Sequence, residues 1–169
     1  MHPAYDCWRQ IIRRCYSEKS LEKKPRYLDA SVSAEWLYFS NFLSWWRRNH
    51  VPSWQIDKDI LTDSKIYSPF SCIFVPKWIN CIVNDSLRSR GKLLIGASNH
   101  SRDGVIEAYA RNSITNRKEY LGRFVNQHDA HLAWKNRRLE IIDQLKYEMD
   151  QIDSRIHQRV RFIISHRLI

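Results

Sequence analysis

The 169-residue chain has no long apolar run. None of its hydrophobic stretches approaches the roughly 18 consecutive residues of a membrane-spanning helix. The first residues, Met1 to Asp6, lack the basic and apolar regions of a signal peptide. We therefore expect a cytoplasmic protein with no membrane partner.

The four cysteines include no Cys-x-x-Cys pair. Zinc ribbons and dithiol redox sites use that spacing, so the pattern argues against both. Buried free thiols are the expectation. Cys72 and Cys81 flank an acidic segment closely enough to leave a metal or disulfide role open.

Acidic residues are scarce relative to basic ones. Lys and Arg number 28 and Asp and Glu 18, which gives a formal charge of +10. The basic residues are spread along the chain, a distribution that fits either a polyanionic partner or a solvated basic surface. A hydrophobic content of 43% is enough for a buried core, so disorder is not expected.

Hydrophobic periodicity predicts an α+β protein in three parts. The first, residues 1–90, has an amphipathic helix from Tyr5, a polar loop at 17–26 and an aromatic helix that Pro52 ends. Strands at 54–61 and 72–75 and a short helix from Pro76 follow. The basic turn at 88–92 is the predicted domain boundary.

The second part, residues 91–152, alternates as three strands near 93–97, 105–111 and 118–124. A long helix from Gln127, capped by Asn126, is predicted to cover the apolar face of their sheet. The third part, 153–169, is a basic amphipathic helix that docks on the body or on a partner.

Acidic and amide side chains gather between Gln55 and Asn80. Because strand residues alternate between faces, we expect Asp57 and Asp59 on one face and Lys58 on the other. Two carboxylates can then converge on a cation, as a metal-dependent nuclease requires in a basic chain that attracts phosphate. The alternative is that the pair only decorates a hairpin and balances nearby arginines.

Basic side chains occur next to this segment on both sides. Arg47, Arg48 and His50 end the aromatic helix, where they satisfy its dipole or contact phosphate. Arg88 and Arg90 in the basic turn are further candidates for DNA contact.

The ordered motifs of the first part resemble the HNH-type homing endonuclease-like proteins of bacteriophages. The residues that carry this resemblance are Trp8, Arg14-Cys15-Tyr16, Val32, Glu35-Trp36, Phe39, Phe42, Trp45, Asp57-Lys58-Asp59-Ile60-Leu61, Tyr67-Ser68-Pro69, Cys72, Phe74-Val75-Pro76 and Ile79-Asn80. The resemblance implies a ββα-metal unit in which Asp57 and Asn80 hold Mg²⁺ or Mn²⁺.

The same resemblance puts Lys58 where the family usually has the histidine that activates water. A lysine ammonium is almost fully protonated at pH 7 and cannot accept a proton from water. Asp59 could serve as base or second ligand, His50 could reach the site, or Lys58 could stabilise the phosphorane as a point charge. A further interpretation is that Lys58 does not correspond to the family's histidine at all.

The later part looks like the ethylene-response-factor-type DNA-binding domain. Its matching residues are Gly96-Ala97, Tyr109-Ala110, Tyr120-Leu121-Gly122, Phe124, Asp129-Ala130-His131 and Ala133-Trp134. This resemblance implies that the polar sheet face enters the major groove of DNA. The expected DNA contacts are Arg102, Tyr109, Arg111, Arg117 and Lys118.

The leading prediction is a divalent-metal-dependent endonuclease that cleaves or nicks double-stranded DNA in the cytoplasm of a phage-infected bacterium. A homodimer would match a palindromic target. One alternative is a DNA-binding protein whose nuclease unit has lost its base. Another is a phage protein that binds a host protein through the basic C-terminal helix.

Overall fold

The computed structural model describes residues 2–83, 93–99 and 104–167. The chain divides into two compact units, residues 1–77 and 78–169. Helices and short strands occur in both, and the second holds a three-stranded antiparallel sheet, which confirms the α+β class. The predicted boundary at 88–92 lies outside the described residues.

About half of the first unit is helical. The helices are α1 (Pro3–Tyr16), α2 (Glu18–Lys23), the 3₁₀ turns η1 (Pro25–Tyr27) and η2 (Ala34–Leu37), and α3 (Phe39–Asn49). Helix α2 lies where a loop was predicted, and none of its residues is buried, so apolar periodicity could not reveal it. Helix α3 ends three residues before Pro52, as expected.

An aromatic cluster forms the core of the first unit. The ring of Trp36 lies 4.9 Å from that of Phe42 and 4.8 Å from that of Trp45. Phe74 stacks on Trp45 at 5.5 Å and so joins a later strand to α3. Helix α1 adds Ile11 and other buried side chains to the same cluster.

Four short strands complete the first unit. Strands β1 (Ser31–Val32) and β3 (Ile66–Tyr67) pair in parallel. Strands β2 (Gln55–Asp57) and β4 (Ile73–Val75) pair antiparallel, with Asp57 opposite Ile73. Strand β2 therefore stops at Asp57, whereas the sequence predicted a strand to residue 61.

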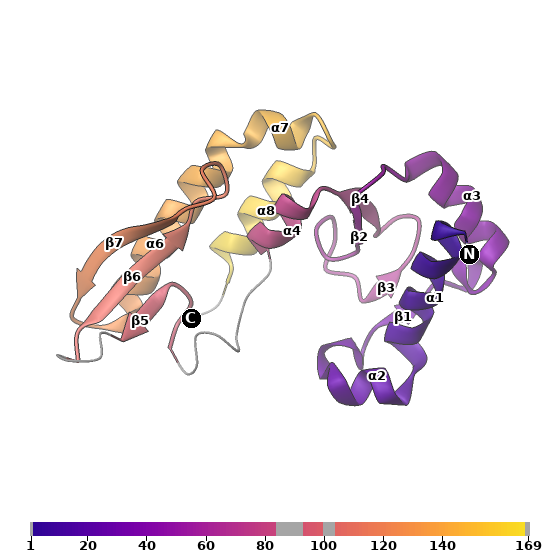
Figure 1. Ribbon diagram of the computed structural model, residues 1–169, viewed down its shortest axis with the longest axis horizontal. Coiled ribbons are helices and arrows are strands. Elements are labelled where there is room, and N and C mark those ends of the chain that lie inside the picture. The colour runs from indigo at the N-terminus through magenta and orange to yellow at the C-terminus, as the bar shows by residue number, and fades with distance from the viewer. Residues whose placement is uncertain (1, 84–92, 100–103, 168–169) are drawn as a thin grey trace. The chain divides into compact units, whose positions relative to one another are not determined.

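The second unit combines its sheet with helices (Figure 1). Helix α4 (Lys77–Val83) begins at the last residue of the first unit. The sheet has the order β5 (Ala97–Asn99), β6 (Ile106–Arg111), β7 (Lys118–Phe124), and the helices that follow are α6 (Gln127–Gln144), α7 (Lys146–Asp150) and α8 (Ile156–Ser165). Helix α6 contacts the sheet and α8.

Side chains of strand β6 alternate between a buried and an exposed face of the sheet, and the buried face is the one predicted to be apolar. Ala108 and Ala110 are fully buried, whereas Arg111 is exposed. The Asn126 side chain accepts hydrogen bonds from the N–H groups of His128 and Asp129, which confirms the predicted cap. The long helix is interrupted at Leu145, which separates α6 from α7.

The C-terminal helix docks on the body of the second unit. Ile156, Val160 and Ile164 of α8 are fully buried, and α8 contacts α6 and α7. Within the described residues, no helix combines the length and apolarity needed to cross a membrane.

Strand β5 begins four residues later than predicted. Gly96, which the sequence placed inside the strand, has a φ of +88°, in the left-handed region that favours glycine. Segment 93–96 is held on α6 instead, because the Leu94 N–H donates to Gln127 Oε1 at 3.1 Å. His131 Nδ1 also lies 2.9 Å from the Ile95 carbonyl oxygen.

Candidate functional site

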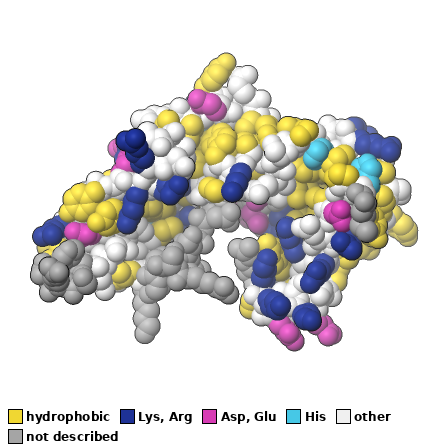
Figure 2. All heavy atoms as spheres, in the orientation of Figure 1, with side chains coloured by type: hydrophobic (Ala, Val, Ile, Leu, Met, Phe, Trp, Pro, Cys, Tyr) yellow, Lys and Arg dark blue, Asp and Glu magenta, His cyan; other side chains and the backbone are white. Residues whose placement is uncertain are grey.

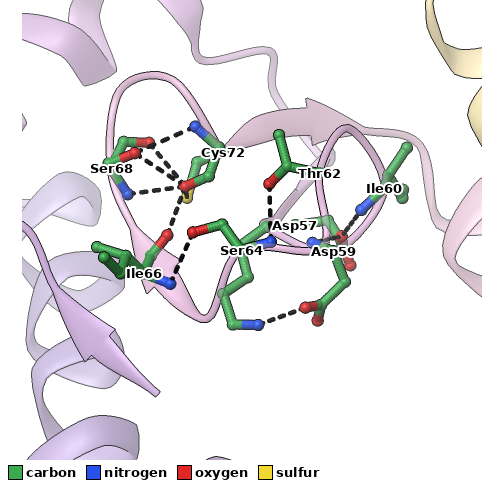
Figure 3. Close-up of polar contacts among 10 residues, drawn as sticks. Asp57, Asp59, Ile60, Thr62, Ser64, Ile66, Ser68 and Cys72 are labelled. Carbon is green, nitrogen blue, oxygen red and sulfur yellow. Dashed lines mark hydrogen bonds and ion pairs between the residues drawn. The ribbon is translucent and has the colours of Figure 1, made fainter. Parts of the chain in front are cut away.

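The Asp57 carboxylate ends strand β2 and organises the turn that follows. Its Oδ1 accepts hydrogen bonds from the N–H groups of Asp59 at 2.7 Å and Ile60 at 2.9 Å (Figure 3). Burial raises the pKa of the Asp57 carboxyl, against the effect of these two bonds. No hydrogen bond to Oδ2 is found within the described part of the chain.

Lys58 points into the first unit. The residue is 4% exposed, its ammonium pairs with the Asp59 carboxylate, and its Nζ lies 5.5 Å from the centroid of the Tyr67 ring. The Asp59 side chain is 64% exposed. Strand β2 ends at Asp57, so Lys58 and Asp59 belong to the turn and strand alternation does not set their directions.

His50 lies on the core side of the β2–β4 strand pair. Its ring stacks on Trp46 at 3.8 Å and meets Phe74 edge-on at 5.3 Å. Phe74 is opposite Ile56 in the β2–β4 pair, and strand alternation directs Ile56 and Asp57 to opposite faces. Burial lowers the pKa of His50, which favours the neutral imidazole.

The remaining predicted residues of the first unit lie on the surface. Arg47 and Arg48 are exposed in the last turn of α3, where cations satisfy the helix dipole. They remain candidates for phosphate contact.

The predicted metal ligands do not belong to one unit. Asp57 and Asp59 lie in the first unit, whereas Asn80 is buried in α4 of the second. Among the described residues, no group of three His, Cys, Asp or Glu side chains is arranged to hold a metal ion. Mg²⁺ commonly keeps several waters and binds one or two carboxylates, so Asp57 alone still fits as a ligand.

The outer face of the β5–β6–β7 sheet gathers cationic and aromatic side chains. The cross-strand partners on this face are Glu107 with Arg123, Tyr109 with Tyr120, and Arg111 with Lys118. Figure 2 shows Lys and Arg side chains beside hydrophobic ones over β6 and β7. The sequence predicted Tyr109, Arg111 and Lys118 for this face and missed Tyr120 and Arg123.

Hydrogen bonds and ring contacts fix the middle of this face. The Tyr109 hydroxyl donates to Glu107 Oε2 at 2.8 Å, and Arg123 Nε lies 3.4 Å from Glu107 Oε1. The Lys118 ammonium lies 3.7 Å from the centroid of the Tyr109 ring. Glu107 thus contacts both the Arg123 guanidinium and the Tyr109 hydroxyl, while the Lys118 ammonium packs on the Tyr109 ring.

Side-chain hydrogen bonds also hold the loop between strands β6 and β7. Asn112 Oδ1 accepts the N–H groups of Ile114 at 2.8 Å and Thr115 at 3.1 Å. Arg111 donates to Asn116 Oδ1, and Arg117 is exposed at the end of the loop. The other predicted DNA contacts, Arg88, Arg90 and Arg102, lie outside the described residues.

No protein-family model matches this chain, and no curated protein or solved structure gave a match.

Proposed function

We propose that this protein binds DNA through the outer face of the β5–β6–β7 sheet. The observation that carries the proposal is the cross-strand pair of Arg111 and Lys118. Like charges directly opposite each other destabilise a sheet, and among the described residues neither cation pairs with a carboxylate. A phosphate backbone placed across the strands offsets this repulsion.

The shape of the surface supports the same partner. A two-stranded β ribbon fits the major groove of B-form DNA, and β6 and β7 present their side chains from such a ribbon. Glu119, the acid next to Lys118, faces α6 instead, where Arg137 Nε binds its Oε2 at 2.7 Å. The acid is thus removed from the face that would meet phosphate.

Salt-dependent binding to a mixed-sequence DNA duplex tests this proposal. We expect Arg111→Ala and Lys118→Ala each to weaken binding and to lower the slope of log K against log salt by about 0.9, the effect of one lost phosphate contact. Lys146→Ala is the matched control, because it removes one exposed cation from α7 and leaves the sheet unchanged. An equal loss in the control would show that only net charge matters and would refute the sheet interface.

A second candidate function is divalent-metal-dependent DNA cleavage at Asp57. It is favoured by the position of Asp57 at the end of strand β2 in the β2–β4 pair, where only Oδ1 accepts hydrogen bonds among the described residues. A bound Mg²⁺ or Mn²⁺ would supply charge neutralisation at the scissile phosphate. Lys58 receives no role as a base, because its ammonium is buried against Asp59.

Nicking of supercoiled plasmid in Mg²⁺ or Mn²⁺ tests the second candidate. We expect Asp57→Ala to abolish nicking and Asp59→Ala to retain it, since the Asp59 carboxylate is engaged by Lys58. A wild-type protein that shifts the plasmid in a gel and never nicks it would eliminate cleavage and leave the binding proposal standing.

A further inference from the structure

We propose that the sheet face also binds single-stranded nucleic acid, with an unpaired base stacked on the ring of Tyr120 and a neighbouring phosphate bound by Lys118. The inference rests on the proposed function, because it uses the same face. It adds unpaired nucleic acid as a second form of ligand for this face.

A β-bulge places both residues on the outer face. Ala108 pairs with Gly122, but the next residue, Tyr109, pairs with Tyr120, so Leu121 is an extra residue in β7. Gly122 has a φ of +125°, a conformation that other residues rarely adopt. Without the bulge, Tyr109 would face Leu121, and Tyr120 and Lys118 would turn toward α6.

Neighbouring contacts hold Lys118 and Tyr109 before any ligand arrives. The Tyr109 ring is tied to Glu107 by its hydroxyl at 2.8 Å, and the Lys118 ammonium lies on that ring at 3.7 Å. A lysine whose chain is already ordered loses less conformational entropy on binding phosphate. Because Lys118 lies over Tyr109, that ring is less accessible to a base.

Tyr120 provides the accessible ring. The residue is 54% exposed, and its ring centroid lies 5.4 Å from that of Tyr109 with a tilt of 56°. In a duplex both faces of each base are covered by neighbouring bases, and only base edges reach the groove. An exposed ring flanked by cations therefore matches an unpaired base, the combination that single-strand-binding surfaces use.

The test compares the affinity of the full-length protein for fluorescein-labelled oligothymidylate with that for a mixed-sequence duplex. We expect Tyr120→Ala to weaken oligothymidylate binding about tenfold or more, the loss typical of one stacked base, and duplex binding less than about twofold. Tyr120→Phe keeps the ring and should bind like the wild type, whereas Tyr120→Leu should lose affinity because it is apolar without being aromatic.

Tyr147→Ala is the matched control, because Tyr147 is 72% exposed on α7 and lies outside the sheet. Equal losses for Tyr120→Ala on both nucleic acids, or none on oligothymidylate, would overturn the stacking inference. Failure of the underlying function has a different signature, in which Arg111→Ala and Lys118→Ala leave duplex binding unchanged.

Discussion

Gly96 lies where the chain enters the sheet, and its replacement by alanine should be strongly destabilising. A Cβ built at Gly96 would lie 2.2 Å from Cβ and Cγ of Trp134. Trp134 is 5% exposed and stacks against His131, with ring centroids 5.4 Å apart. The indole therefore has little room to move, and the backbone at Gly96 must shift instead.

Two costs combine in Gly96→Ala. The φ of +88° costs a residue with a Cβ about 1–2 kcal/mol, and forcing extra volume into a packed site costs about 1–3 kcal/mol. We expect a total loss of about 2–5 kcal/mol in the free energy of unfolding. Urea denaturation followed by far-UV circular dichroism measures it.

Gly104→Ala separates the two costs. Gly104 has a φ of +65°, and a Cβ there meets nothing within 4 Å, so only the backbone cost of about 1–2 kcal/mol applies. Equal losses for the two variants would refute the steric argument. Because the Tyr109 N–H donates to the Gly96 carbonyl oxygen at 2.9 Å, Gly96→Ala should also weaken DNA binding, and Gly104→Ala should not.

Three further predictions concern ionisable groups of both units. Burial raises the pKa of Asp57, so its stabilising contribution belongs to the protonated form and is lost as pH rises through that pKa. At pH 7, Asp57→Asn should therefore unfold in urea no more easily than the wild type, whereas Asp57→Ala, which loses both turn bonds, should be about 1 kcal/mol less stable. Burial lowers the pKa of His50, so its contribution is present above the ordinary value of 6.5 and is lost as pH falls below it. Urea midpoints of His50→Phe should then fall less steeply between about pH 7 and pH 5 than those of the wild type, and parallel curves would contradict this reasoning. Burial raises the pKa of the Cys72 thiol to about 12, whereas Cys81 is exposed, so iodoacetamide should alkylate Cys81 in the native protein and Cys72 only in urea, as peptide mass spectrometry can show.

Long periodic elements could be predicted from the sequence because their apolar spacing is repeated. Helix α6 begins at Gln127 as predicted, since Asn126 provides an unambiguous cap. Helix α2 could not be predicted, because it buries no residue and so leaves no apolar period to detect. Strand β5 was placed four residues too early because Leu93 to Ile95 is apolar, although the Gly96 backbone turns there.

The Asp57 to Asp59 segment shows why the extent of strand β2 could not be predicted from alternation alone. An aspartate at the end of a strand can accept N–H groups two and three residues later, and this local turn competes with strand continuation. Asp57 forms both bonds, so Lys58 is directed into the unit and Asp59 to solvent. The sequence shows that two acids and a lysine are adjacent, but only the turn determines that Asp57 Oδ1 is used by the backbone N–H groups of Asp59 and Ile60.

The side chains that the outer sheet face presents are likewise set by a local irregularity, the single extra residue in strand β7. Continuous alternation through β7 would put Glu119 opposite Arg111 on the outer face and turn Lys118 inward, which gives a locally neutral pair. The bulge at Leu121 instead sends Glu119 to Arg137 and brings Lys118 opposite Arg111. An isolated glycine in a strand, here Gly122, is the sequence signal for such a bulge. One inserted residue thus converts a balanced surface into two adjacent cations beside an exposed tyrosine, and the proposed binding of a polyanion by this face depends on that register.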